Sequence, residues 1–327
     1  MGNLFLIYFP QFLLLLCLRQ VLAANIQNQS RPYSTRLVSK VAFDGTDFDG
    51  WQSQGSSCKR RTVQNLLSVT LRKRFNSSIL SVVGSSRTDK GVHARGQTIH
   101  FDLPEDVLWL DKDGSYRSLD TNLVTKSGEL DLQHLEFSIN RMLPDDCKMF
   151  NIEVAPNGLE SGGKYFHSIG SASGKVYSYQ FCTNKFVDPL RKRNVSHFWN
   201  PNFNIHVFGE ILTLFIGSNN FKAFSNKADK PGNNFSYIRT INDIKLIKEG
   251  DGYYRIDFTL TSALYKMIRN IVGTAKIIAE GGGGNDRKMD KEYVKELLLN
   301  NGERYSREHN LASCAPPEGL CLEAVLF

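Results

Sequence analysis

No other stretch limits what this chain can fold into as much as residues 84–94, which read GSSRTDKGVHA. Before this run we expect residues 80–83 to form a short apolar strand, and residues 97–103 after it alternate polar and apolar side chains as a half-buried strand does. A turn between two strands holds its side chains at a defined point of a rigid scaffold, so Asp89 is a candidate reactive group. A nearby cation, Arg87, favours the ionised form of such a carboxylate. The simpler alternative is a polar turn whose Asp only bonds its own backbone.

The spacing of apolar residues predicts two similar groups of strands and helices. In the first group we expect a strand at 37–43, a helix after the N-cap Thr62, an insertion at 105–128 and a helix near 130–142. In the second group we expect a strand at 175–181, a helix at 203–215, paired strands at 238–247 and 253–260, an amphipathic helix at 264–275, and a last helix from Asp290 to about residue 299. Two such groups predict an α+β fold.

This organisation divides the chain into a leader (1–35), an N-terminal unit with the Asp89 run (36–170) and a C-terminal unit (171–327). Residues 5–16 are apolar but too short to span a bilayer, and no Lys or Arg precedes them as a signal peptide requires. The first acidic residue is Asp44, and an acid-poor leader with Ser and Arg is typical of organellar transit peptides. We therefore expect a chloroplast or mitochondrion and no stable membrane association. A misassigned start codon, with a cytoplasmic or nuclear protein, and secretion are the alternatives.

The charge and the cysteines narrow the class of partner. The 327-residue chain has a formal net charge of +7, which suits a polyanion. Basic triplets at 59–61, 72–74 and 191–193 are each either solvated surface or part of a surface that tracks phosphates. The six cysteines form no C-x-x-C pair and do not combine with histidines at zinc spacing. We expect a reduced compartment and no metal site.

Residues 84–94 resemble the GRTDxGVHA signature of the TruA family of tRNA pseudouridine synthases, with Ser86 in place of the usual Gly and Lys90 in place of a small residue. Further segments resemble family motifs in the family's order: residues 43–54 (FDGTDFDGWQSQ), 140–146 (NRMLPDD), 175–179 (KVYSY), 217–224 (GSNNFKAF, with Asn for His and Asp), 239–241 (RTI), 264–273 (LYKMIRNIVG) and 315–320 (APPEGL). The resemblance runs from about residue 36 to residue 327. An ordered set of this kind is specific, whereas one motif alone is weak.

The resemblance implies the pseudouridine synthase fold, in which two similar α/β units with mixed, mostly antiparallel sheets surround a central cleft, and it implies a homodimer. It implies an isomerase, an intramolecular transferase that converts uridine to pseudouridine in the anticodon stem-loop of tRNA (positions 38–40) without a cofactor. Asp89 matches the catalytic nucleophile. Arg87, Tyr177, Arg269 and Leu320 match substrate-binding positions: Arg87 fills the gap left by the base or holds a phosphate, Tyr177 and Leu320 pack on the base, and Arg269 pairs with Asp89.

Pseudouridine formation breaks a glycosidic bond, rotates the uracil and rejoins it through C5. This chemistry needs a carboxylate that acts covalently, and a stacked uridine must first be extruded. Whether the adduct forms at the base or the ribose stays open. The matched positions also have purely structural alternatives. Arg87 could form an ion pair, Tyr177 and Leu320 could belong to the core, and Arg269 could lie on an exposed helix face. The motif places His93 in the active-site loop, and its alternative is an ordinary loop or core position. The alternative functions are a catalytically idle RNA-binding relative of the same fold and a non-enzymatic RNA-binding module.

Overall fold

The computed structural model describes residues 35–52, 61–77, 80–103, 107–110, 115–118, 120, 122–156, 165–226, 235–282, 289–299 and 305–327. The predicted leader lies outside these ranges except for Thr35. By their internal contacts the described residues fall into two compact units, one within 36–101 and 132–327 and a smaller one that consists of Thr35 and the described residues of 102–131. The domain boundary expected near residue 171 stays a prediction.

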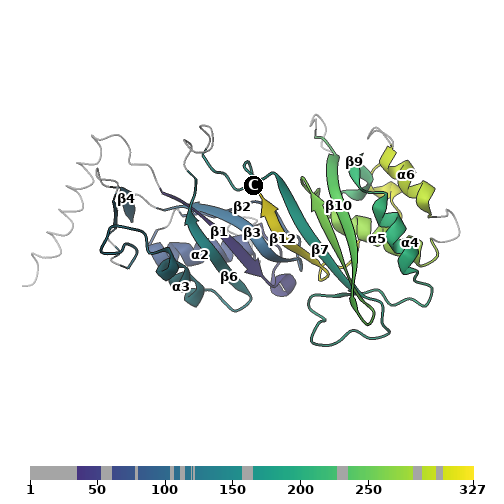
Figure 1. Ribbon diagram of the computed structural model, residues 1–327, viewed down its shortest axis with the longest axis horizontal. Helices are drawn as coiled ribbons and strands as arrows, with labels where there is room; N and C mark the ends of the chain where they lie inside the picture. Colours follow the sequence, from purple (N-terminus) through teal and green to yellow (C-terminus); the bar gives the residue numbers. More distant parts are fainter. Residues whose placement is uncertain are drawn as a thin grey trace, which may run out of the picture. The chain divides into compact units, whose positions relative to one another are not determined.

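The larger unit is built on one mixed sheet of ten strands in which eight follow the order β6-β1-β3-β12-β7-β11-β10-β9, while β2 pairs with β3 and β8 with β7 (Figure 1). The strands are β1 (Arg36–Phe43), β2 (Val83–Gly84), β3 (His93–Asp102), β6 (Cys147–Val154), β7 (Gly174–Cys182), β8 (Ser196–His197), β9 (Gly217–Asn220), β10 (Ile238–Gly250), β11 (Tyr253–Leu260) and β12 (Leu320–Leu326). The pairs β12–β3 and β7–β8 are parallel, and the other pairs are antiparallel. The expectation of an α+β fold with a mixed, mostly antiparallel sheet is confirmed.

The last strand of the chain lies in the middle of this sheet. β12 pairs with β3 on one side, where Cys321 is opposite His93, and with β7 on the other, where Leu322 is opposite Tyr177. Leu320 and Leu322 are buried, so the strand contributes to the core as well as to the hydrogen-bond ladder. The two groups of elements expected from the sequence are thereby joined in one continuous sheet.

Helices pack beside the two ends of the sheet. Figure 1 shows α2 (Val63–Phe75) and α3 (Leu132–Met142) beside the part that holds β1 and β6, and α4 (Ile205–Thr213), α5 (Met267–Ala279) and α6 (Lys291–Leu299) beside the part that holds β9 and β10. The 3-10 helices η1 (Gly45–Asp47), η2 (Lys222–Phe224) and η3 (Arg307–His309) lie in connections. None of the described helices is long and apolar enough to cross a membrane.

An aromatic core holds β7 in place. Phe181 stacks on Phe198 with ring centroids 4.8 Å apart and on Tyr254 at 5.3 Å, and Phe208 meets it edge-on at 5.2 Å. Each buried aromatic side chain of this size contributes roughly 1.5–3 kcal/mol to folding. The strand that carries Tyr177 is therefore anchored in the core through Phe181.

The structure confirms two predicted helix starts and corrects two other local predictions. Thr62 is the N-cap of α2 by position, but its side chain makes no capping hydrogen bond. The apolar residues 80–83 form a strand only at Val83–Gly84, because Leu80 and Val82 are buried without joining the ladder. The helix expected from residue 264 begins at Met267, since the backbone of Lys266 is left-handed, and this helix is buried on its polar as well as its apolar side. Asp290 caps α6 as expected, accepting from the amides of residues 292 and 293.

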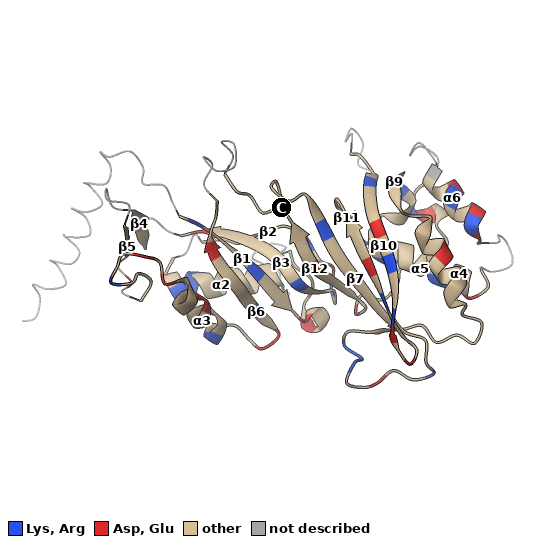
Figure 2. Ribbon diagram, viewed as in Figure 1, with Lys and Arg blue, Asp and Glu red and all other residues tan. Residues whose placement is uncertain are grey.

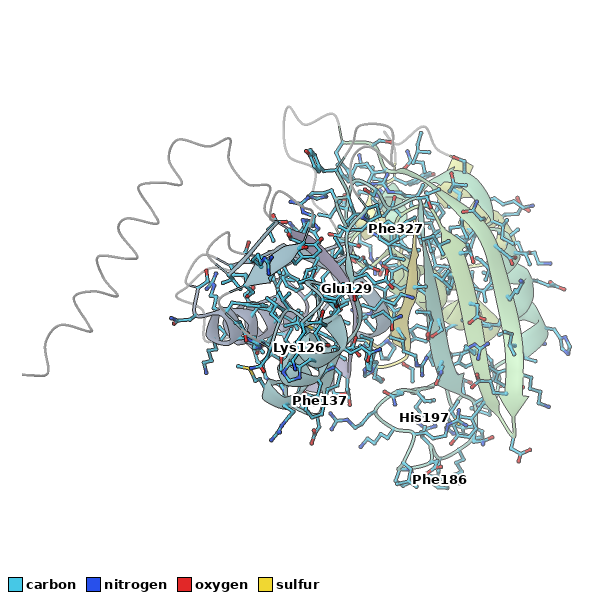
Figure 3. All side chains as sticks on the ribbon, turned by 60° about the vertical axis from the view of Figure 1, so that its left-hand side comes forward. Lys126, Glu129, Phe137, Phe186, His197 and Phe327 are labelled. Atoms are coloured by element: carbon cyan, nitrogen blue, oxygen red, sulfur yellow. The ribbon has the colours of Figure 1, made fainter. Side chains whose placement is uncertain are left out.

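The long connection after β7 carries the basic triplet at 191–193. Figure 2 shows Lys and Arg residues on this loop and on α2 and α3. In Figure 3 the side chain of Phe186, which is 76% exposed, projects from the same loop. The smaller unit contains a two-stranded sheet of β4 (Leu108–Leu110) and β5 (Tyr116–Ser118), where the sequence predicts an insertion.

Candidate active site

A cavity of about 1290 Å³ opens beside Asp89 in the larger unit. Its wall comes from the loop between β2 and β3, from β7, from the start of α5 and from the first residue of β12. Four of the five residues that the sequence singles out line this cavity: Arg87, Asp89, Tyr177 and Leu320. The fifth, Arg269, reaches Asp89 from α5. Asp89 and Arg269, which are 180 positions apart in the chain, are thus brought to one site.

Asp89 and Arg269 form a buried ion pair, as predicted. Arg269 Nη1 donates to Asp89 Oδ2 at 3.0 Å. The side chain of Arg269 is 10% exposed and that of Asp89 is 16% exposed. Arg269 Nε donates to the carbonyl of Ala315 at 2.8 Å, so the guanidinium is held from two directions. Within the part of the chain that the structure describes, Asp89 Oδ1 has no hydrogen-bond partner. One oxygen of this cavity-lining carboxylate is thus anchored by Arg269, and the other has no partner among the described residues.

The electrostatic environment of Asp89 differs from the expectation in one respect. The cation in contact with it is Arg269, whereas Arg87, two residues away, is exposed and pairs with no described carboxylate. Burial raises the pKa of Asp89, while Arg269 and Lys266 act in the opposite direction without cancelling the effect. A desolvated carboxylate with a raised pKa and a specific counterion is a frequent feature of functional sites.

Tyr177 closes one wall of the cavity from β7. Its side chain is buried, and its hydroxyl lies 3.0 Å from Ser86 Oγ. Burial raises the pKa of Tyr177 to about 12, with the Asp89 charge acting in the same direction, so the phenol stays protonated at neutral pH. Leu320 is 7% exposed and adds an apolar surface. An aromatic ring and a leucine beside a carboxylate suit a flat, polar ring such as a nucleobase.

A family model described as tRNA pseudouridine synthase matches residues 40–151 and 211–327, most of the chain. The chain belongs to the tRNA pseudouridine synthase family. A tRNA pseudouridine synthase A of Protochlamydia amoebophila is 31% identical over 289 residues, covering 88% of this chain and 94% of that protein. A relative of the same name from Lactococcus lactis is 28% identical, and the match covers 90% of this chain and 97% of that protein. One from Bacillus cereus is 30% identical, and the match covers 89% of this chain and 98% of that protein.

Two departures from the usual motif of this pseudouridine synthase family have visible roles. Ser86, where a Gly is usual, supplies the hydroxyl that contacts Tyr177, and its backbone amide donates to the carboxamide oxygen of Gln97 at 3.2 Å. Lys90, where a small residue is usual, donates to Asp49 at 2.9 Å across the rim of the cavity. Gly91 adopts φ +78°, which a residue with a side chain rarely adopts. The turn that presents Asp89 is therefore braced on both sides.

Other motif residues lie elsewhere in this pseudouridine synthase. His93 is buried at the start of β3 and accepts from the Gly45 amide through Nδ1 at 3.0 Å. It lines a separate cavity of about 300 Å³ together with Asp44, and burial lowers the pKa of His93 although the Asp44 carboxylate opposes this. The ordinary structural interpretation of His93 is the one that this geometry favours. No group of three or more His, Cys, Asp or Glu among the described residues is arranged to hold a metal ion.

The basic triplet after β7 is partly neutralised by acids. Arg193 donates to Asp44 at 2.7 Å and to Asp47 at 2.9 Å. Arg191 lies 3.4 Å from Glu249 and covers the ring of Tyr253. Two of the three cations thus fasten the loop, and Lys192 is the member without an ion pair among the residues described. For the triplet at 59–61, residues 59 and 60 lie outside the described ranges.

Sequence reasoning missed three residues that line this cavity or hold its wall: Ser86, Lys175 and Lys266. Ser86 was visible only as a departure from the motif. Lys175 stands two positions before Tyr177, a spacing that puts both side chains on one face of a strand, and this signal was available. Lys266 stands just before an apolar helix, where a polar residue is ordinary, so no pattern distinguished it.

Proposed function

We propose that Asp89 is the nucleophile with which this tRNA pseudouridine synthase isomerises uridine in the anticodon stem-loop. The observation that carries the proposal is the asymmetric carboxylate: Arg269 binds Oδ2, Oδ1 has no hydrogen-bond partner among the described residues, and Asp89 lines a cavity large enough for a nucleotide. The resemblance of residues 84–94 to the family signature assigns the nucleophile to the same residue.

The reaction conserves atoms and electrons. The bond from N1 of uracil to ribose C1′ breaks, the base rotates, a bond from C5 to C1′ forms, the C5 hydrogen leaves as a proton and N1 takes up a proton. Asp89 joins one fragment covalently and is released at the end, which divides one difficult step into easier ones. Arg269 favours the ionised carboxylate and fixes its orientation, since an opposite charge in direct contact stabilises the charged form.

The remaining cavity residues act on the extruded base. Arg87 is exposed and has no partner among the described residues, so its guanidinium is available to occupy the gap in the RNA or to hold a phosphate. The alternative of a structural ion pair has no support among the described residues, none of whose carboxylates pairs with Arg87. Tyr177 and Leu320 provide a packing surface, and the protonated phenol of Tyr177 acts as a hydrogen-bond group rather than as a base.

The test in cells is to map pseudouridines in RNA from cells that lack this protein. We expect the loss of pseudouridine on the 3′ side of the tRNA anticodon stem-loop, restored by the wild-type chain and not by Asp89→Ala. If these sites remain modified and another RNA loses pseudouridine, the substrate assignment fails while the chemistry stands. If the Asp89→Ala chain restores modification, the nucleophile assignment fails.

An idle RNA-binding relative is the competing function. It predicts tRNA binding without turnover, and purified wild-type protein would then release no tritium from tRNA labelled at uracil C5. We expect stoichiometric release, because the carboxylate, its counterion and the base-packing surface are all present.

We further propose that the protein acts as a homodimer in a chloroplast or mitochondrion. The dimer is supported by the family resemblance and the compartment by the acid-poor leader. Sedimentation equilibrium tests the first, with a monomer mass as the contrary result. Comparing organellar with cytosolic tRNAs in the same mapping experiment tests the second, with loss confined to cytosolic tRNAs as the contrary result.

A further inference from the structure

The charges that line the Asp89 cavity do not balance within the protein. Two carboxylates that line it are paired: Asp49 with Lys90 at 2.9 Å, and Asp89 with Arg269 at 3.0 Å. Two lysines of the wall, Lys175 and Lys266, have neither a hydrogen bond nor an ion pair with any described residue. Arg269 is explained by its ion pair with Asp89. The two lysines have no such pair, so they need an explanation of their own.

Lys175 lies on β7, between β11 and β12, opposite Leu260 on one neighbour and Val325 on the other. It shares a face of the strand with Tyr177, two positions further on, so its side chain is directed along the same wall. Burial lowers the pKa of Lys175, and the nearby guanidinium of Arg239 acts in the same direction. Arg239 itself donates to the carbonyls of Ser236 and Ile238 and pairs with no carboxylate of the described residues. A half-buried cation held next to a second cation is an unfavourable arrangement unless an anion joins them.

Lys266 stands at the other wall, three residues before Arg269 and immediately before α5. Its backbone has φ +61°, a left-handed conformation that is uncommon for a residue other than glycine, and this strain is found where a site requires a particular side-chain placement. Its charge acts on the carboxyl of Asp89. The ammonium lies 5.3 Å from the centroid of the Tyr265 ring, which also lines the cavity.

We propose that Lys175 and Lys266 bind two backbone phosphates next to the uridine that enters the cavity, one phosphate for each lysine. The cavity then receives a short single-stranded segment, with the base beside Asp89 and Tyr177 and the backbone spanning from one lysine to the other. Phosphate is the anion that an extruded nucleotide brings with it, and ammonium groups bind it as point charges. This assignment rests on the proposed function and adds the groups that orient its substrate.

The competing explanation is that both lysines only favour the ionised form of Asp89. It predicts a changed pH profile of turnover and unchanged binding of RNA. Phosphate binding predicts the reverse for Lys175: weaker binding, a smaller dependence of affinity on salt, and an unshifted acidic limb of the pH profile. Removing one lysine–phosphate interaction should reduce the slope of log K against log salt by roughly 0.7–0.9.

The decisive test combines protein variants with neutralised phosphates. The tRNA is assembled from synthetic pieces and carries one uncharged methylphosphonate, on either the 5′ or the 3′ side of the target uridine. The nucleotide at that linkage has 2′-deoxyribose. The matched control tRNA has the same deoxyribose and a normal phosphate. Binding is measured for the full chain, for Lys175→Met and for Lys266→Met. We expect each single change to weaken binding about tenfold or more.

Each lysine variant should be insensitive to the methylphosphonate at its own phosphate and remain sensitive to the other one. If the losses multiply at both positions for both variants, neither lysine binds these phosphates and the proposal is wrong. Lys248→Met is the control, because Lys248 is an exposed lysine of β10 outside the cavity. It should respond to both methylphosphonates as the wild type does.

Lys266→Gly separates the charge from the strained backbone. Glycine accepts the left-handed conformation, so the melting temperature should stay the same or rise while RNA binding weakens as in Lys266→Met. Full binding by Lys266→Gly would show that the charge is not used. The failures of the two proposals are distinguishable: without tritium release by wild-type protein the proposed function fails, whereas turnover with unchanged salt slopes in the lysine variants refutes the phosphate assignment alone.

Discussion

Removing the counterion of Asp89 should shift the pH at which the enzyme works. Arg269 contacts Asp89 Oδ2 at 3.0 Å, and burial already raises the pKa of that carboxyl. In Arg269→Met the burial remains and the opposing charge is lost, so the pKa of Asp89 rises further. Because the carboxylate must be ionised to attack, turnover is lost as the pH falls through that higher pKa. The acidic limb of the profile of kcat/KM therefore moves to higher pH.

The magnitude follows from the direct pairing of the two groups. An opposite charge within about 4–6 Å lowers the pKa of a carboxyl by about one to three units, so the limb should move by that amount. Below the shifted pKa, each unit reduces the ionised fraction about tenfold. The side chains are 10% and 16% exposed, so solvent screens the pair little. Breaking a buried pair costs about 3–5 kcal/mol of folding stability, less whatever protonation of Asp89 recovers.

The assay is tritium release from uracil-5-labelled tRNA between about pH 5 and pH 9, with the fold of each variant checked by circular dichroism and thermal melting. Arg269→Lys is the matched variant, because it keeps the charge but cannot bind Asp89 and the Ala315 carbonyl as a planar fork does. Its limb should move less than that of Arg269→Met. An Arg269→Met enzyme that folds, loses activity and keeps the wild-type limb would refute the assignment of Arg269 as the group that sets the ionisation of Asp89.

Three further outcomes can be checked separately. Ser86→Gly removes the 3.0 Å hydrogen bond with the Tyr177 hydroxyl and should lower the free energy of unfolding by about 1–2 kcal/mol in urea titrations, whereas an unchanged midpoint would contradict this role. Gly273→Ala should lower the melting temperature despite the helix preference of alanine, because a Cβ there would stand 2.0 Å from the Ser313 carbonyl oxygen, and a higher melting temperature would contradict the packing. Lys192→Ala should flatten the salt dependence of tRNA binding by roughly 0.7–0.9, since the two arginines beside it already face carboxylates, and an unchanged slope would exclude the triplet from the RNA surface.

The spacing of apolar residues predicted the elements that have a strong local pattern. It failed where an apolar residue is buried without belonging to a strand. The paired strands predicted at 238–247 and 253–260, which the structure has at Ile238–Gly250 and Tyr253–Leu260, and the helix capped by Asp290 were predictable because alternation and capping are local. Leu80 and Val82 were misassigned to a strand because they are apolar for another reason: both are buried, and their carbonyls accept hydrogen bonds from the side chains of Arg72 and Gln64. The start of α5 was misplaced because nothing in the sequence indicates the left-handed backbone of Lys266.

The long-range arrangement was beyond local patterns. No periodicity states that β12, the last strand in the chain, inserts between β3 and β7. The pairing of Asp89 with Arg269 was predictable only through family resemblance, supported by the oddity of a charge within an apolar helix. Lys175 could have been found from its place on the same strand face as Tyr177, whereas no pattern distinguishes Lys266. The property that the two lysines share is that neither has a hydrogen bond or an ion pair with a described residue. That property depends on every neighbour in space, and a sequence pattern contains only neighbours along the chain.

The central claim is that the Asp89 carboxylate performs the covalent step. Its most direct test is the single-turnover rate of tritium release by Asp89→Ala, measured beside the affinity of the same variant for tRNA. Loss of a general base alone costs about two to four orders of magnitude, and loss of an obligatory nucleophile should cost more, so we expect no measurable release with nearly unchanged affinity. A variant that binds tRNA and keeps more than a tenth of the wild-type rate, a change of less than about 1.4 kcal/mol in the barrier, would contradict the account.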